Sequence, residues 1–128
     1  MTNSKTDTMR WVLWLNTVAE TIIAFGMFFA PAAFFPGAEG LSSSIARAFS
    51  FAIFAVAFIS FTAVWKSTPM DTVKNVVTIL LFYHIFQLIA QFVNGVMYPP
   101  MLIPPVAIHS VFTVLFGAYF FRLRSSVI

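Results

Sequence analysis

The sequence contains no cysteine and very little charge. Only 9% of its 128 residues are charged, whereas 60% are hydrophobic. The absence of cysteine excludes disulfide bonds, thiolate metal sites, cysteine nucleophiles and cysteine-ligated iron–sulfur clusters. A soluble domain carries about 25% charged residues, so this chain has too few polar side chains to cover a water-facing surface. The composition therefore predicts an integral membrane protein.

Motifs for common catalytic chemistry are absent as well. The sequence has no HExxH motif, no nucleophile-elbow frame around Ser50 or Ser110, and no glycine-rich phosphate loop. Its seven Lys and Arg residues outnumber four Asp and Glu, but they are scattered and form no basic patch. We therefore expect a protein that is not an enzyme and does not bind nucleic acid.

Long apolar segments make up most of the chain. A helix needs about 20 residues to cross the roughly 30 Å hydrocarbon core of a bilayer, which leaves room for four spans in this length. No Lys, Arg, Asp or Glu occurs from Asn75 to Phe121. We expect a single all-α domain, a transmembrane four-helix bundle, with spans over about residues 11–30, 44–65, 73–97 and 102–121.

Helix boundaries are indicated by capping and breaking residues. Pro31 and the glycines after it end the first span. Residues 42–44 are three serines that suit the N-cap of the second span, and Asp71 or Thr72 suits that of the third. Pro104 and Pro105 fall in the first turn of the fourth span, where a missing N–H costs least.

Basic residues indicate how the spans are oriented. With four spans, six of the seven basic residues fall on one side of the membrane: Lys5, Arg10, Lys66, Lys74, Arg122 and Arg124. Arg47 lies near the opposite side. The positive-inside rule therefore places both termini in the cytoplasm. The polar N-terminus lacks a cleavage motif, so we expect the first span to be uncleaved.

Polar residues within the spans follow helical periodicity. Asn16 and Glu20 are four residues apart in the first span. His84, Gln87, Gln91 and Asn94 form one stripe in the third span, and His109 and Thr113 form a shorter one in the fourth. Because a polar side chain in hydrocarbon needs a partner, we expect these stripes to face one another.

The depth of each polar residue follows from its distance to the cytoplasmic end of its span, at about 1.5 Å per residue. Glu20 and His84 lie at about 13 Å, Gln87 and His109 at about 18–20 Å, and Arg47 and Gln91 at about 24 Å. The candidate ligand or proton site comprises Asn16, Glu20, Arg47, His84, Gln87, Gln91 and His109.

Several roles are open for these residues. Glu20 is a structural acid bonded to His84, a proton or cation site, or a ligand contact. His84 and His109 are structural, ligate a haem iron between them, or form a metal site with Glu20. Arg47 extends to the interface or pairs with Glu39; alternatively it turns inward to Gln91 and Asn94 and binds an anionic ligand. No motif requires a cofactor or metal; haem and quinone are the open alternatives.

The chain resembles the small bacterial membrane proteins of the DoxX-like group. The resemblance rests on the Asn16 and Glu20 stripe, IARAF at the start of the second span, FYHIFQ in the third and VAIHSVFTVLFGAYFFR in the fourth. It implies a four-helix bundle in the inner membrane, in a group that includes accessory subunits of redox systems. We therefore expect binding of a lipid- or quinone-like ligand, or assembly with a partner membrane subunit or a second copy.

A local resemblance gives the alternative. VAET around Glu20 is similar to the first span of small multidrug-resistance transporters, whose carboxylate exchanges protons for cationic drugs. The third span lacks that family's Trp-and-Gly substrate face, and the six-to-one distribution of basic residues disagrees with dual topology. The second hypothesis is a proton-coupled transporter that uses Glu20.

Overall fold

The computed structural model describes residues 4–34, 40–95 and 103–125, and the regular structure in these ranges is entirely helical. The helices are α1 (Ser4–Phe29), α2 (Pro31–Phe34), α3 (Leu41–Thr62), α4 (Met70–Gly95) and α5 (Ile103–Ser125). Four of them contain apolar spans of 23, 21, 24 and 18 residues, long enough to cross a membrane. The predicted all-α class with four spans is confirmed, and the chain is a multi-pass membrane protein.

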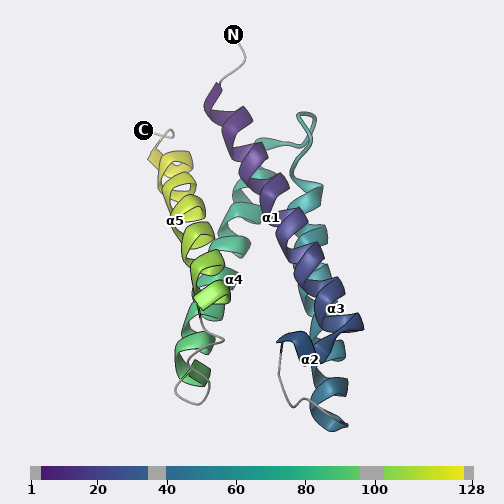
Figure 1. The fold of residues 1–128 in the computed structure, drawn as a ribbon. Coiled ribbons are helices and arrows are strands. Elements are labelled where there is room, and N and C mark those ends of the chain that lie inside the picture. The colour runs from purple at the N-terminus through teal and green to yellow at the C-terminus, as the bar shows by residue number, and fades with distance from the viewer. Residues whose placement is uncertain (1–3, 35–39, 96–102, 126–128) are drawn as a thin grey trace. The chain divides into compact units, whose positions relative to one another are not determined.

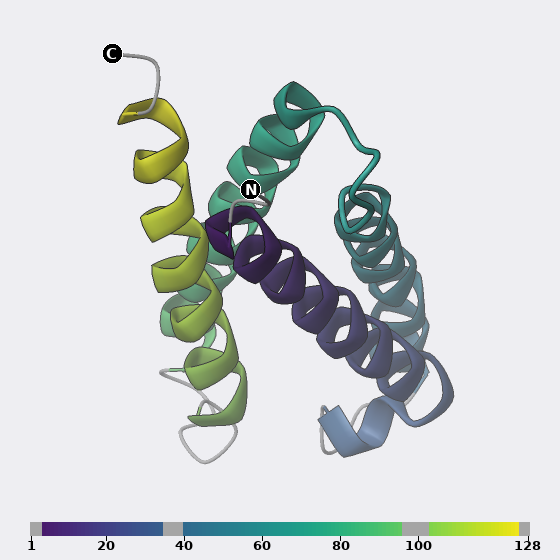
Figure 2. The same ribbon diagram turned by 90° about the horizontal axis from the view of Figure 1, so that it is seen from above.

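The chain divides into two compact units, Met1–Lys66 and Ser67–Ile128. In the first unit α1 packs along α3, and in the second α4 packs along α5 (Figures 1 and 2). We call these two units the α1–α3 hairpin and the α4–α5 hairpin. Each is described by itself.

The start of α3 differs from the prediction. Gly40, with φ at 55°, occupies the N-cap, and no side chain caps the helix. Glycine adopts this left-handed conformation readily because it has no Cβ. The three serines instead lie in the first turn, where the hydroxyl of Ser44 donates to the Gly40 carbonyl at 3.2 Å. The predicted serine cap is therefore wrong.

Other helix ends also shift by a few residues. Helix α1 begins at Ser4, several residues before the predicted start. Helix α4 begins at Met70, which places Asp71 in its first turn rather than at the cap. A carboxylate is still favourable there because it faces the positive end of the helix dipole. Pro104 and Pro105 lie in the first turn of α5, as predicted.

Pro31 ends α1 as expected, but the residues after it form the short helix α2. Pro31 is the buried first residue of α2, a position that tolerates its missing N–H. The ring of Phe34 packs so closely over Gly26 of α1 that a methyl group added at Gly26 would overlap it. Because Gly26 has no side chain, the Phe34 ring can pack directly against α1.

Buried residues form one stripe along each long helix. On α1 the stripe is Met9, Leu13, Asn16, Glu20, Ala24 and Met27, with spacings of three and four. It packs on α3, where Ala46 and Ile53 complete a cluster with Ala24 and Met27. Small residues such as alanine let membrane helices approach closely.

Helices α4 and α5 show the same three-and-four spacing. The fully buried residues of α4 include Val73, Val77, Leu80 and His84. The buried residues of α5 include His109, Phe112, Phe116 and Tyr119. Large apolar side chains cover the outer surfaces, with Trp11, Phe29 and Phe121 about 70% exposed. Such a surface suits hydrocarbon rather than water.

Candidate functional site

Two histidines meet in the middle of the α4–α5 hairpin. The Nδ1 atom of His84 lies 2.8 Å from the Nδ1 atom of His109, which is a hydrogen-bonding distance. Both side chains are buried, with 0% and 6% of their surfaces exposed. Helical periodicity explains why both point inward: His84 continues the stripe of Val77 and Leu80, and His109 begins that of Phe112.

Aromatic rings surround the histidine pair. Phe112 and Phe116 of α5 stack on His84, with ring centroids 5.0 and 5.6 Å from the imidazole and interplanar angles of 20° and 17°. Tyr83 lies edge-on to both imidazoles, at 5.0 Å from His84 and 6.0 Å from His109. These contacts restrict the rotation of the imidazoles, so the pair is held in place by packing as well as by its hydrogen bond.

The contact corrects the predicted depths. The sequence estimate placed His84 and His109 in different layers. Measured on the observed helices, His84 lies 14 residues from the start of α4 and His109 lies 16 residues from the end of α5, or about 21 and 24 Å. The predicted depths were too small because α4 begins earlier and α5 ends later than predicted. The depth of His84 increases more than that of His109, so the difference in depth between them falls from about 5–7 Å to about 3 Å.

The geometry of the pair determines what it offers to a ligand. When both imidazoles are neutral, one Nδ1 donates its proton and the other accepts it. The donating ring then has a bare Nε2 with a lone pair, and the accepting ring carries its proton on Nε2. The pair therefore has one N–H donor and one acceptor at its Nε2 atoms, and exchanging the two roles takes two proton shifts, one between the Nδ1 atoms and one between the Nε2 atoms.

A haem iron does not fit between these nitrogens as they stand. Two ligands on opposite sides of a metal, each with a bond of about 2 Å, would be about 4 Å apart. The Nδ1 atoms of His84 and His109 are only 2.8 Å apart and are bonded to each other. The geometry therefore disfavours ligation of a haem iron between the two Nδ1 atoms, and ligation through the Nε2 atoms stays a prediction. A metal site formed by the histidine pair together with Glu20 stays a prediction, because Glu20 lies in the other hairpin and each hairpin is described by itself.

Polar residues continue along both helices from the pair. Gln87 and Gln91 are half-buried and follow His84 by one and two turns of α4. Thr113 follows His109 by one turn of α5, and its buried hydroxyl has no hydrogen-bond partner among the residues described. The side chain of Asn94 lies outside the described residues. The predicted stripes therefore lie beside the pair, and Thr113 provides a hydroxyl that a ligand could satisfy.

Asn16 and Glu20 occupy the buried face of α1, as their spacing predicted. Both have 0% of their surface exposed. The α3 contact beside them is polar too: Ser60 donates its hydroxyl to the Leu13 carbonyl at 2.9 Å, and Thr17 donates to the same carbonyl at 2.9 Å. The α1–α3 hairpin thus contains its own polar layer. Whether Glu20 meets His84 stays a prediction.

Within the α1–α3 hairpin, Arg47 hydrogen-bonds to the backbone of α1, and its predicted contact with Gln91 and Asn94 stays a prediction. It is exposed, and its Nε donates to the Phe28 carbonyl at 3.1 Å. Carbonyls in the last turn of a helix lack an intrahelical donor, so the cation satisfies the end of α1. Glu39 lies outside the described residues. Pro31 lacks the N–H that would bond the Met27 carbonyl four residues before it, so it does not single out the Phe28 carbonyl, and no sequence pattern identifies this contact.

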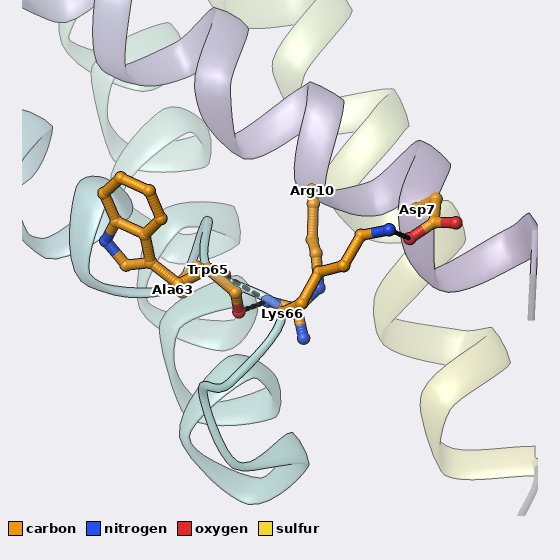
Figure 3. A network of polar contacts seen from close by, with 5 residues as sticks. All are labelled: Asp7, Arg10, Ala63, Trp65 and Lys66. Carbon is orange, nitrogen blue, oxygen red and sulfur yellow. Dashed lines mark hydrogen bonds and ion pairs between the residues drawn. The ribbon is translucent and has the colours of Figure 1, made fainter. Parts of the chain in front are cut away.

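Arg10 is a structural residue that the sequence analysis missed, because it was interpreted only as an indicator of orientation. Its side chain is 7% exposed, and Nη1 donates to the Ala63 carbonyl at 3.0 Å and to the Trp65 carbonyl (Figure 3). The guanidinium therefore binds the C-terminal end of α3. Beside it, Lys66 and Asp7 form an exposed ion pair at 3.7 Å (Figure 3).

Comparison with protein families, curated proteins and solved structures finds no match to this chain. Its function therefore has to be inferred from its own side chains. Among the described residues, the His84–His109 pair combines burial, hydrogen-bonding capacity and an aromatic enclosure.

Proposed function

We propose that the chain is a small, non-enzymatic membrane protein that binds a quinone- or lipid-like ligand at the His84–His109 pair. The observation that carries the proposal is the direct hydrogen bond between two buried imidazoles that are enclosed by the rings of Phe112 and Phe116. A buried polar pair in hydrocarbon costs free energy unless its remaining groups are satisfied. A ligand oxygen that accepts from an imidazole N–H or donates to an imidazole nitrogen would bind at this pair.

Quinones suit this pair in both oxidation states. The carbonyl oxygen of a quinone accepts a hydrogen bond from the Nε2–H, and the hydroxyl of a quinol donates one to the bare Nε2. The rings of Phe112 and Phe116 suit a flat aromatic head, and an ester carbonyl of a lipid would use the same donor.

The setting of this site follows from the sequence. The DoxX-like resemblance supports a location in the bacterial inner membrane and a role as an accessory subunit of a redox complex, with a partner membrane subunit or a second copy. The distribution of basic residues supports cytoplasmic termini. In such a complex the chain would hold the ligand while its partner performs the electron transfer.

Retention of a short-tailed ubiquinone analogue tests the proposal. The full chain in detergent is mixed with the analogue and passed through a size-exclusion column, and the retained quinone is measured by mass spectrometry. We expect His84→Gln and His109→Gln each to lower retention about tenfold, since each leaves a buried polar group unmatched. Phe86→Leu, which changes an exposed residue of α4, is the matched control and should retain as much as the original chain.

The outcome is decisive for the ligand. Equal retention in both histidine variants and in the control would show that quinone partitions into the detergent or binds elsewhere, and the proposal would be wrong. Thermal unfolding of each variant shows whether a loss of retention comes from a loss of fold. If His84→Gln does not fold, His109→Gln gives the test alone.

A second candidate is proton-coupled transport by Glu20. The observation that favours it is the complete burial of this carboxyl group in an apolar span, which is uncommon without a function. Uptake of ethidium into proteoliposomes should follow an imposed proton gradient and disappear in Glu20→Gln. Uptake that persists unchanged in Glu20→Gln, or its absence from the original chain, would exclude this candidate.

A further inference from the structure

A pocket lies in the α4–α5 hairpin, at the end where α4 begins and α5 ends. It has a volume of about 190 Å³ and is lined by Lys74, Asn75, Thr78, Phe120 and Leu123. This is more than ten times the roughly 15 Å³ that one water molecule needs, yet smaller than the roughly 300 Å³ of sites for drug-sized ligands. Its size therefore suits a small polar group.

The two walls of the pocket differ in chemistry. Helix α4 contributes the Lys74 ammonium and the Asn75 amide, which are hydrogen-bond donors, while α5 contributes the apolar Phe120 and Leu123. The Thr78 hydroxyl already donates to the Lys74 carbonyl at 2.8 Å, so the lysine and the amide are the donors left for a ligand. A cation beside apolar side chains matches an anionic head joined to an acyl chain.

Asp71 does not neutralise this site. Its carboxylate pairs with Lys74 at 3.6 Å, but the Asp71 side chain is 93% exposed, and Asp71 does not line the pocket. Exposed pairs of this kind contribute little free energy, so a phosphate that enters the pocket competes with it easily. The Lys74 side chain itself is 34% exposed, and its stem packs against the helices.

The position of the pocket matches the headgroup layer of a membrane. Lys74 is one turn into α4, and Leu123 is in the last turn of α5. The pocket is separate from the histidine pair, because Lys74 and His84 are ten residues apart, or about 15 Å along α4. We propose that this pocket binds the phosphate headgroup of an anionic phospholipid, with its acyl chain along Phe120.

Lipid preference of the purified full chain tests this proposal. Binding of the first molecule of phosphatidylglycerol is compared with that of phosphatidylcholine by native mass spectrometry in detergent. We expect a preference for phosphatidylglycerol that falls about fivefold in Lys74→Gln, the effect of one lysine near an anionic lipid, and that is kept in Lys74→Arg. Lys66→Gln is the matched control, because it also removes one lysine charge, but from a lysine that pairs with Asp7 in the α1–α3 hairpin.

Each result has a defined meaning. Equal losses in Lys74→Gln and Lys66→Gln would show diffuse attraction by the basic end of the chain and would overturn the proposal, as would the absence of any preference in the original chain. A second measurement separates lipid from free anion: inorganic phosphate at constant ionic strength should not raise the thermal unfolding temperature in detergent, whereas phosphatidylglycerol should. Equal stabilisation by both would make this a free-phosphate site and contradict the lipid assignment.

Discussion

The hydroxyl of Ser60 on α3 donates to the carbonyl of Leu13 on α1 across 2.9 Å, at a position where both residues are fully buried. Thr17 donates to the same carbonyl from within α1. Because Leu13 lies within α1, its carbonyl also accepts the backbone N–H of Thr17, so the two hydroxyls share the oxygen with a helix bond. The α1–α3 hairpin is thus joined by a hydrogen bond as well as by packing of its small residues.

Removing the Ser60 hydroxyl should weaken the α1–α3 hairpin. We expect Ser60→Ala to lower the free energy of unfolding by about 0.6 kcal/mol and by no more than about 1.7 kcal/mol, the range found for interhelical hydrogen bonds in membranes. Unfolding in mixed micelles of dodecylmaltoside and sodium dodecyl sulfate measures it. Thr62→Val is the control, since the exposed Thr62 hydroxyl bonds to Ile59 in its own helix, and its effect should stay within about 0.5 kcal/mol. An equal effect of both changes would contradict the interhelical bond.

Arg10 should contribute more to stability than Lys66. Arg10→Gln removes the charged donor that binds the end of α3, and we expect a loss of about 1.5–3 kcal/mol in the free energy of unfolding. Lys66→Gln breaks only an exposed ion pair and should cost less than about 1 kcal/mol. The same micelle titration measures both variants. A larger loss in Lys66→Gln would show that the ion pair, and not the guanidinium, holds the end of α3.

His84 and His109 should be energetically coupled. A double-mutant cycle with His84→Phe and His109→Phe should give a coupling free energy of about 0.5 kcal/mol or more, because each single change removes the same hydrogen bond. Thr78→Val replaces His109→Phe in the control cycle: its hydroxyl bonds to Lys74, so its effect should add to that of His84→Phe. Additivity in the first cycle would mean that the imidazoles do not meet.

Glu20 and His84 form a second cycle, which tests the predicted common layer. If the two residues meet, Glu20→Gln and His84→Phe should couple by about 0.5 kcal/mol or more in thermal unfolding in detergent. Strict additivity would show that the buried carboxyl group has another partner. Coupling alone would not establish transport, because a structural pair and a proton relay give the same cycle; the ethidium assay separates them.

The orientation of the chain can be measured by labelling. The sequence has no cysteine, so Gly37→Cys and Ser67→Cys each introduce a unique thiol. An impermeant maleimide added to intact cells should label the cysteine at position 37 from outside, and the one at position 67 only after the cells are opened. Labelling of both from the same side would be incompatible with four spans and with cytoplasmic termini.

Hydropathy and helical periodicity were sufficient to predict the four spans and their buried stripes. The exclusion of backbone polar groups from hydrocarbon leaves few alternatives to helices of about 20 residues. Helix ends were less predictable, because they depend on local backbone geometry. Three serines in a row suggested a cap for α3, yet Gly40 takes that position with a left-handed backbone. Helix α2 was not expected, since Pro31 indicated only where α1 stops.

The sequence predicted which residues belong to the candidate site, but it did not predict which of them are in contact. Periodicity placed His84 and His109 on buried faces, as observed. Their bond depends on the vertical offset of two helices, and an error of three or four residues at a helix end shifts that offset by about 5 Å. The partners of Arg10 and Arg47 are main-chain carbonyls at helix ends, which no side-chain pattern in the sequence identifies.

The pairing of helices within each hairpin has a consequence for biosynthesis. Helix α1 packs against α3 and α4 against α5, so each pair is brought together by a short connection. Short connections close at low entropic cost, and chains assemble from the N-terminus as they are made. The α1–α3 hairpin can therefore associate in the bilayer while α4 is still being synthesised. Its contacts beyond α3 wait for Trp65, whose carbonyl accepts a hydrogen bond from Arg10, and for Lys66, which pairs with Asp7. The ribosome must therefore pass the end of α3 before the first hairpin is closed.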